Sequence, residues 1–517
     1  MNNIKVFRNV YLYDDCANAH KEQFFVVQDG LVQYIGGNLP PFRDEFELVN
    51  GGYISKPFCD YHYHLPGSHL FDVFGVNLSN CKSIHEYKDY LRKKTTGMKI
   101  VRGFGWEVES LRQFFLKETN ETPLQFIDSI FPDKPAVLFS FDFHSCWCNS
   151  LALKALLKEK IVGLFNDEEI PYGSNCVLHE QIANQLFDSK TFSFSDKEIR
   201  EAILAQQELF LENGITEIYS LMFIGAKYEK TLEILRDLDK EGKLIINVNF
   251  AYTAYQNQTL NEIRCAIQAS KQLQSNHLRF AAIKIYLDGV IDNHSAYLLE
   301  PYSDDLGRGK CLWSEFDMQK LTELSLEENI PLHIHAIGDA AVKFAVDILS
   351  LYKHPNSGRH IIAHIQLCNQ NVMKNMAKND IVACMQPFWF ERGENMCEID
   401  RLRLGGRVLH EYPARSLKNH GVKLLFSSDC PASETFNPIV GITMAAHDDG
   451  SSETLSLRDG YKCYYQGAYK NDPISIKIGD KADFIVLDGD ITKQPFVKVV
   501  ATYLGGEPVG SKHGGAR

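Results

Sequence analysis

Hydrophobic and polar residues follow one repeated pattern from about residue 200 onward, in which a helix-like stretch precedes a short apolar run. Residues 201–213 (EAILAQQELFLEN) carry apolar side chains at helical spacing and stop at Gly214, before the apolar run 215–219. Apolar residues three and four apart share one face of a helix, whereas a short continuous apolar run is typical of a buried strand. The same order recurs twice more, in 229–241 followed by 244–250 and in 260–273 followed by 281–286.

Further strand-like runs extend this series to the end of the pattern. With the strand 53–64 they make about eight strands separated by helices, which is the number that a (β/α)8 TIM barrel requires. Alternating helices and strands favour parallel pairing. An open doubly wound sheet is the alternative, but it would normally show an early glycine-rich phosphate loop, and the sequence has none. The later runs lie at 331–335, 360–364, 381–386 and 423–429.

Two parts of the chain do not fit a plain barrel, which we expect to span 58–435. Residues 66–200 are far longer than one crossover, and they predict a large insertion after the first barrel strand that caps the active site. Both ends of the chain alternate apolar and polar residues between turn signals such as Asp29-Gly30. Segments 1–57 and 436–517 therefore predict a small β-sandwich domain built from both termini.

Composition and charge narrow the class of protein. The chain has 517 residues, of which 44% are hydrophobic and 23% charged, as in an ordinary globular protein. The 54 basic and 66 acidic side chains give a net charge of −12 without a basic stretch, so we expect no nucleic-acid partner. No signal-peptide core and no run of about 18 apolar residues is present, so we expect no membrane span. The 13 scattered cysteines do not resemble a disulfide framework and favour a cytoplasmic location.

The strand 53–64 ends in a His-x-His pair, His62 and His64. Residues two apart on a strand share one face, so both imidazoles can reach one metal ion. Other predicted barrel strands end in further ligand-type residues, and strand ends of a barrel converge on one rim. Imidazole and carboxylate ligands without thiolate suit zinc, with iron or manganese as alternatives. The further residues are Lys284, His335, His364 and Asp429.

Each of these residues also has a simpler structural interpretation. A single strand-end histidine such as His335 or His364 is more often a hydrogen-bonded core residue. His333 lies two residues before His335 and points to the same face, so the spacing leaves open which of them binds metal. Asp429 could cap a turn, and Lys284 could form a buried salt bridge. The joint placement at strand ends favours a metal site.

Several motifs together resemble the amidohydrolase superfamily, in the branch that contains the N-substituted formamide deformylases. The resemblance covers nearly the whole chain and is carried by short segments. It implies a metal-dependent hydrolase on a TIM barrel. The segments are 52–64, 103–106 (GFGW), 144–153 (HSCWCNSLAL), 284–289 (KIYLDG), 335–339 (HAIGD), His364, Gln386-Pro387, 428–431 (SDCP) and 478–488 (IGDKADFIVLD).

The resemblance also implies a role for each ligand-type residue. His62 and His64 would hold a more buried metal, and His335 and His364 a second one. Lys284 would bridge the two after carboxylation by carbon dioxide, because a bare ammonium would be repelled by two cations whereas a carbamate supplies anionic oxygens. Asp429 would bind metal and act as general base and then general acid.

Substrate contacts are expected in the same region, at His144 and Trp147 of the insertion and at Glu180, Asp288, His294 and Gln386. Trp147 could instead belong to the core of the insertion, and Glu180 could cap a helix. The chain departs from the branch at 290–295 (VIDNHS) and at Ala363, so substrate identity should not be taken from the resemblance. Aromatic residues at 388–390 (FWF) favour an apolar or aromatic substrate group.

The sequence thus predicts an enzyme that hydrolyses a carbon–nitrogen bond of a small non-peptide amide, formamide or cyclic amide. A hydrolytic deaminase and an ester or lactone hydrolase could use the same chemistry and remain alternatives. A non-catalytic binding homologue is a third, but such relatives typically lose metal ligands, and here every expected position is filled. The resemblance further suggests a homodimer.

Overall fold

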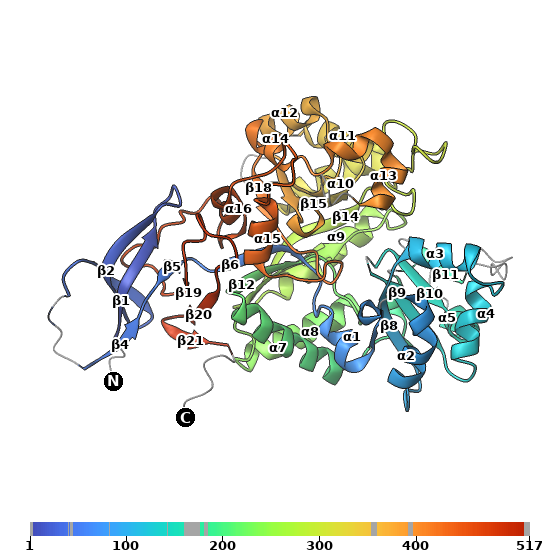
Figure 1. Ribbon diagram of the computed structural model, residues 1–517, viewed down its shortest axis with the longest axis horizontal. Helices are drawn as coiled ribbons and strands as arrows, with labels where there is room; N and C mark the ends of the chain where they lie inside the picture. Colours follow the sequence, from blue (N-terminus) through green and yellow to red (C-terminus); the bar gives the residue numbers. More distant parts are fainter. Residues whose placement is uncertain are drawn as a thin grey trace.

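The computed structural model describes residues 4–39, 41, 45–81, 83–141, 143–159, 176–179, 183, 185–352, 359–390 and 397–510. Three units are visible in Figure 1: a barrel in the centre, a sheet made from both ends of the chain on the left, and an inserted domain on the lower right. Within the described residues, no helix combines the length and the apolar character needed to cross a membrane.

Eight parallel strands form the central barrel, and neighbours in the sheet follow one another in chain order. Backbone bonds from Asp429 N to His62 O (2.8 Å) and from His64 N to Cys430 O (3.0 Å) connect the segment after the last strand to the first, so the sheet is nearly closed. An open doubly wound sheet reverses its strand order, and this sheet does not. The strands are β6 (Phe58–Tyr63), β12 (Ile215–Ser220), β13 (Asn247–Thr253), β14 (Leu278–Tyr286), β15 (Leu332–Ala336), β16 (Ile361–His364), β17 (Val382–Met385) and β18 (Leu424–Phe426).

Several helices around the barrel begin at residues whose side chains cap them, among them α7 (Asp196–Glu212), α9 (Leu260–Gln272), α10 (Glu315–Glu328) and α12 (Gln370–Lys378). In α7, Ser195 and Glu198 form a reciprocal capping box that satisfies otherwise unpaired N–H groups. The predicted stop at Gly214 is confirmed, since α7 ends two residues earlier and Gly214 has φ +76°. The other surrounding helices are α8 (Tyr228–Lys240), α11 (Asp339–Leu349) and α14 (Ala414–Asn419).

The strand predicted for 53–64 is two strands. β5 (Tyr53–Ser55) pairs with β1 and β19 in the terminal sheet, whereas β6 belongs to the barrel. Pro57 lies between them, and proline cannot donate a backbone hydrogen bond to a sheet. One short stretch of chain therefore connects the terminal sheet to the first barrel strand.

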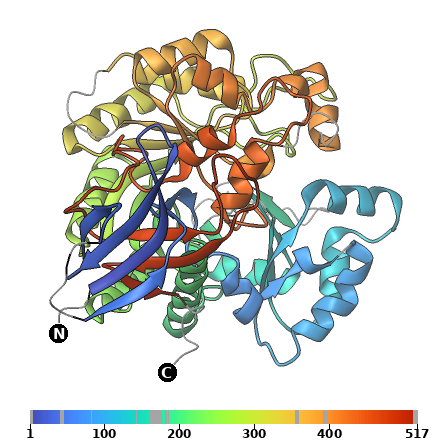
Figure 2. The same cartoon turned by 60° about the vertical axis from the view of Figure 1, so that its left-hand side comes forward.

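The strands from the two ends of the chain belong to one hydrogen-bonded eight-stranded sheet with a branch at β1. The ten-residue β1 (Ile4–Tyr13) is long enough to pair with β4 (Phe46–Asn50) along its first half and with β5 along its second. Figure 2 shows these N-terminal strands beside the C-terminal ones. The remaining strands are β2 (Ala19–Gln28), β3 (Leu31–Gly36), β19 (Phe484–Leu487), β20 (Val499–Leu504) and β21 (Glu507–Val509).

The first part of segment 436–517 packs on the barrel and not in the terminal sheet. Helix α16 (Leu457–Tyr464) contacts β18 and β6, and α15 (Pro438–Ala445) contacts the short helix η4 (Pro387–Trp389). A barrel needs a covering helix after its last strand, and α16 buries Tyr461 and Tyr464 to provide it. The chain joins the terminal sheet only from β19 onward.

The residues between β6 and β12 contain a five-stranded sheet with helices α1 to α5 around it. The tie between this insertion and the barrel includes Arg403 in α13 (Glu398–Leu404), whose buried guanidinium donates to Glu109 of the insertion at 2.9 Å. The strands, in sheet order, are β11 (Val177–His179), β10 (Ser145–Cys148), β9 (Ala136–Ser140), β8 (Val101–Trp106) and β7 (Val76–Asn77). The helices are α1 (His69–Phe74), α2 (Tyr87–Lys94), α3 (Val108–Lys117), α4 (Pro123–Ile130) and α5 (Ser150–Glu159).

Candidate metal centre

The six ligand-type residues predicted from the sequence lie together at the carboxyl ends of the barrel strands. Strands of a parallel barrel end on one rim, so residues far apart in the chain meet there. All six are buried, with at most 9% of any residue exposed. They come from β6 and the residue after it (His62, His64), β14 (Lys284), β15 (His335), β16 (His364) and the turn after β18 (Asp429).

A first group of these residues, His62, His64 and Lys284, lies around Asp429. Its Oδ1 lies 3.0 Å from Nε2 of His62 and 3.0 Å from Nε2 of His64. The Nζ of Lys284 lies 3.3 Å from the same His62 nitrogen. The potential ligand atoms of His62, His64 and Asp429 all lie within 4.8 Å of one another. Such a spacing of two imidazoles and one carboxylate can hold a divalent cation.

His335 and His364 form a second group beside the first. Their ring centroids are 4.5 Å apart, and the His364 ring lies 5.0 Å from that of His62. Lys284 is fully buried in the same cluster, and it lowers the pKa of both His62 and His364. The arrangement therefore has two pairs of histidines with a lysine beside them.

Burial controls the charge of these groups. It lowers the pKa of His62, His335 and His364 well below the usual value for histidine, and the nearby Lys284 adds to that effect. Burial also lowers the pKa of Lys284 to about 8. Burial alone would raise the pKa of Asp429, but the hydrogen bond with His64 and the nearby His364 and Lys284 outweigh it and leave that pKa below its usual range. Neutral imidazoles beside a carboxylate are the protonation states that bind metal.

Hydrogen bonds outside the cluster orient the second pair of rings. Nδ1 of His364 lies 3.0 Å from Oε1 of Gln386, an acceptor, so Nδ1 carries the proton and Nε2 keeps its lone pair. That Nε2 is buried and has no hydrogen-bond partner among the described residues. Nε2 of His335 lies 3.2 Å from Gly289 O, which leaves Nδ1 as the free acceptor of the ring. Gln386 also donates to Ser427 Oγ at 2.9 Å, so it positions His364.

Asp60 supports the first pair and was not singled out from the sequence. Its carboxylate accepts hydrogen bonds from the backbone N–H groups of His62 and Ser428 at 3.1 Å each, and from Ser428 Oγ at 2.5 Å. Burial raises its pKa to about 7. Asp60 thus ties β6 to the turn that carries Asp429. The sequence does contain a signal for this role. Asp60 lies two residues before His62 on the same strand, so the two side chains share one face.

Asp288, which the sequence predicts at the substrate, accepts three backbone hydrogen bonds. It has no exposed surface and does not line the cavity at the cluster. Its Oδ2 accepts from the backbone N–H groups of Tyr297 (2.8 Å) and Gly338 (2.9 Å), and its Oδ1 accepts from Ile337 N–H (3.0 Å). The same Oδ1 lies 3.7 Å from His335 Nε2. Asp288 therefore holds the loop after β15 in place, because its backbone donors converge on one carboxylate.

The two residues of the insertion that were predicted at the substrate, His144 and Trp147, lie in different surroundings. His144 lines the cavity, with its ring centroid 5.3 Å from that of His335, so a side chain of the insertion reaches the cluster. Trp147 has no exposed surface, stacks on Phe126 and donates to Pro123 O at 3.2 Å. Trp147 therefore packs in the core of the insertion.

His294 lies away from the cavity, in contrast to its predicted role. Its Nε2 is 3.0 Å from Asp304 Oδ1, and its ring packs edge-on against Tyr302. The partners of His294 are residues of its own polar loop, and the sequence pattern does not reveal such contacts. Glu180 lies outside the described residues.

His333 and His335 differ in their position relative to the cavity. His335 lines the cavity, whereas His333 is fully buried and does not. The His333 ring lies 5.0 Å from His62, and within the described residues neither of its nitrogens has a hydrogen-bond partner. Potential ligand atoms of His62, His333 and Cys384 also lie within 4.8 Å of one another, but neither His333 nor Cys384 lines the cavity.

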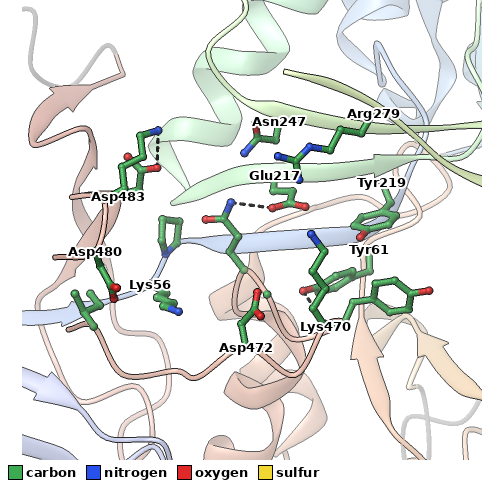
Figure 3. Close-up of a pocket in the computed structure, with 16 residues that line it drawn as sticks. Lys56, Tyr61, Glu217, Tyr219, Asn247, Arg279, Lys470, Asp472, Asp480 and Asp483 are labelled. Atoms are coloured by element: carbon green, nitrogen blue, oxygen red, sulfur yellow. Dashed lines mark hydrogen bonds and ion pairs between the residues drawn. The ribbon is translucent and has the colours of Figure 1, made fainter. Parts of the chain in front are cut away.

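The cavity at the cluster is small, with a volume of about 30 Å³. A larger polar cavity of about 340 Å³ lies where the barrel strands begin, between the barrel and the terminal segment. Figure 3 shows it, with Glu217 and Arg279 on the barrel side and Asp480 and Asp483 on the terminal segment. None of the six clustered residues lines it. Barrel enzymes place their chemistry where the strands end, which favours the smaller cavity.

Comparison with known proteins gives a consistent result. The model of the Amidohydrolase family matches residues 50–510. The chain is 24% identical over 535 aligned positions to the putative amidohydrolase YtcJ of Bacillus subtilis, with 94% of each chain covered. It is 25% identical to the protein LONG AFTER FAR-RED 3 of Arabidopsis thaliana, covering 89% of this chain and 82% of that protein. An uncharacterized metal-dependent hydrolase from Pyrococcus horikoshii shares the fold, with a TM-score of 0.73, 22% identity, and 95% and 99% of the two chains covered.

Proposed function

Because this chain belongs to the amidohydrolase family, we propose that it is a metal-dependent hydrolase that cleaves a carbon–nitrogen bond of a small non-peptide amide, formamide or cyclic amide. One observation carries the proposal: His62, His64 and Asp429 bring their ligand atoms within 4.8 Å, with Lys284 3.3 Å from His62 Nε2. A buried cluster of this composition has no purpose in packing, since each polar group costs free energy when it leaves water.

The residues present fit one or two divalent cations. The buried Nε2 of His364 has no hydrogen-bond partner in the described part of the chain, and a lone pair in that position is costly unless a cation or a water meets it. His62 and His64 would hold one ion, and His335 and His364 a second. Zinc suits these ligands, with iron or manganese as alternatives. A divalent cation in such a site lowers the pKa of a bound water towards neutrality and so supplies a nucleophile.

Lys284 would join the two pairs as a carbamate formed with carbon dioxide. A protonated amine next to cations would be repelled, whereas a carbamate offers two anionic oxygens. The side chain is fully buried, and its Nζ lies 3.3 Å from a ring nitrogen of the first pair. A mass increase of one carbon dioxide, located on Lys284 by peptide mapping at neutral pH, supports this assignment; an unmodified lysine in the metal-loaded enzyme contradicts it.

Asp429 is our candidate for moving the proton. It is buried, ionised by its surroundings and 3.0 Å from both His62 and His64. From this position Asp429 takes a proton from the attacking water and passes it to the leaving nitrogen, which departs as an amine. Gln386 and Asp288 keep His364 and His335 oriented during the reaction. His144 closes the site from the insertion and helps to exclude bulk water.

The test begins with the metal content of the purified protein, measured by plasma mass spectrometry. A substrate panel follows, with formamides, acetamides and cyclic amides assayed for release of amine and, separately, for release of ammonia. We expect bound divalent metal and amine release that stops in dipicolinate and returns with zinc or manganese. Ammonia release alone would point to a deaminase, and hydrolysis of matched esters or lactones alone to an esterase. Full activity in a metal-free preparation would refute the proposal.

The finer placement in the formamide deformylase-like branch rests on the motifs and on Trp389. Its indole stacks on the His364 ring, with centroids 5.4 Å apart and planes 19° from parallel. An aromatic wall beside a metal-ligand histidine suits a substrate with an apolar substituent. Faster turnover of formamides than of acetamides with the same amine part would support this placement, and the reverse order would contradict it.

A further inference from the structure

A cleft of about 500 Å³ lies next to the metal centre, between the insertion and the barrel. The insertion contributes residues of its first half and Phe141, and the barrel side contributes the segments after β17 and β18 and one residue of α15. Nothing so far assigns this cleft a role. Its walls include Phe141, Phe388, Trp389, Glu107 and Glu434.

Among the described residues, none lines both the cleft and the cavity at the metal centre, but neighbouring residues of the same segments line the two. Pro431 and Ala432 line the small cavity, and Ser433 to Thr435, the next residues in the chain, line the cleft. Phe143 and His144 line the cavity, and Phe141 of the same turn lines the cleft. Trp389 lines the cleft and stacks on His364. The two spaces therefore adjoin at the turn after β18, at the β9–β10 turn and at Trp389.

The volumes of the cavity and the cleft indicate which part of a substrate each could hold. About 30 Å³ at the metal centre has room for a water molecule or for the reacting group, but not for an organic substituent. About 500 Å³ lies within the usual range for a small-molecule site. A substrate whose amide carbon reaches the metal centre would then place its larger part in the cleft.

The charge of the cleft is one-sided. Among the described residues that line it, Glu107 and Glu434 are ionisable carboxylates, and none is lysine, arginine or histidine. Glu107 accepts a hydrogen bond from Ser110 Oγ at 2.9 Å, whereas Glu434 has no hydrogen-bonding or ionic partner within the described part of the chain. Both side chains are exposed. The rest of the wall is aromatic, aliphatic or hydroxyl-bearing.

We infer that this cleft is the substrate-specificity site, and that it selects amides whose substituent combines an aromatic or apolar body with a positively charged group. The inference rests on the proposed function and deepens it. The apolar body would lie against Trp389, Phe388 and Phe141, and the cation would face Glu434 and Glu107. An anionic substituent would meet two carboxylates without a compensating cation, so it is disfavoured.

The size of the preference follows from the exposure of the two carboxylates. An exposed ion pair contributes about 0.2–1 kcal/mol, which corresponds to about a 1.5- to 5-fold change in affinity. Two attractive contacts for a cation and two repulsive ones for an anion then separate the two substrates by at least about 5-fold in kcat/KM at low salt. Because exposed charges are screened, the ratio should shrink markedly at about 1 M salt.

The experiment uses three formanilides that differ only in the para substituent: aminomethyl (cationic), methyl (neutral) and carboxylate (anionic). We expect kcat/KM to fall in that order for the metal-loaded enzyme. Glu434→Gln and Glu107→Gln should each reduce the cation-to-anion ratio several-fold. Glu315→Gln in α10, an exposed glutamate that does not line the cleft, removes the same charge and should leave the ratio unchanged.

Calorimetric binding of the same three compounds separates the two possible failures. If no compound is hydrolysed but the cation still binds most tightly in a Glu434-dependent way, the proposed chemistry fails and the cleft assignment holds. If all three are hydrolysed or bound equally, or if Glu434→Gln leaves the ratio as in the wild type, the inference is overturned while the proposed function stands. A preference for the anion also overturns it.

Discussion

Replacing Asp288 by asparagine should loosen the loop that follows β15 and, through it, His335. Asp288 offers a charged, fully buried acceptor to the backbone N–H groups of Tyr297, Ile337 and Gly338, at 2.8, 3.0 and 2.9 Å. Asparagine has almost the same shape but only one oxygen. If that oxygen takes the place of Oδ2, the amide NH2 group faces the Ile337 N–H group. Both groups are donors, so the Ile337 N–H loses its acceptor.

The cost follows from the number of bonds and from the loss of charge. Hydrogen bonds to a charged group are worth about 1.5–3 kcal/mol and those to a neutral one about 0.5–1.5 kcal/mol, so each of the two retained bonds weakens by about 1 kcal/mol. The unsatisfied buried donor adds about 1–3 kcal/mol. We therefore expect Asp288→Asn to lower the free energy of unfolding by about 3–5 kcal/mol.

Urea unfolding followed by tryptophan fluorescence measures this change, and metal analysis shows whether the second pair of ligands still holds an ion. Asp339→Asn is the matched control, because Asp339 is the first residue of α11, directly after that loop, and its Oδ1 accepts one backbone bond, from Leu299 N–H at 2.9 Å. That variant should lose only about 1–1.5 kcal/mol. If the two variants unfold at the same urea concentration and retain the same metal, the positioning role of Asp288 is refuted.

Three further predictions test other parts of the structure. Asp429→Asn should lower kcat by about 10²- to 10⁴-fold without unfolding the protein, and near-normal turnover would contradict its role in proton transfer. Burial and the nearby Asp400 raise the pKa of Glu411 to about 9, so its protonated form is favoured in the folded state, and wild-type stability should fall as the pH rises from about 4.5 to about 9, by up to about 1.4 kcal/mol per unit. Glu411→Gln imitates the protonated form, so its melting temperature should decline less over that range; parallel curves would disprove this. Trp147→Phe should lower the free energy of unfolding by about 1–3 kcal/mol and leave KM unchanged. A rise in KM without loss of stability would instead indicate that Trp147 contacts the substrate.

The barrel could be predicted from the sequence because its signals are local. Helical spacing that ends at Gly214 and the apolar runs that follow depend only on neighbouring residues, and the structure has its strands within a few residues of the predicted runs. The shared face of His62 and His64 follows from the two-residue period of a strand. That the six ligand-type residues gather at one rim follows from barrel topology once the strands are known.

Side chains that act through loops could not be assigned in this way. Asp288 and Gln386 were expected at the substrate, yet one holds three backbone N–H groups and the other orients His364. Trp147 lies in the core of the insertion, and Asp60 escaped notice. In each case the partner is distant in the chain or lies in an irregular segment, where no period links sequence to direction.

The sequence by itself determined the order of helices and strands, the faces of those strands and the chemical types available at their ends. Only the tertiary structure decided which of those groups face the cavity, as with His335 and His333, and which segments enclose the cleft beside it. The physical reason is that secondary structure depends on contacts a few residues apart. A cavity wall depends on how strands close into a barrel and how an inserted domain packs against loops hundreds of residues away.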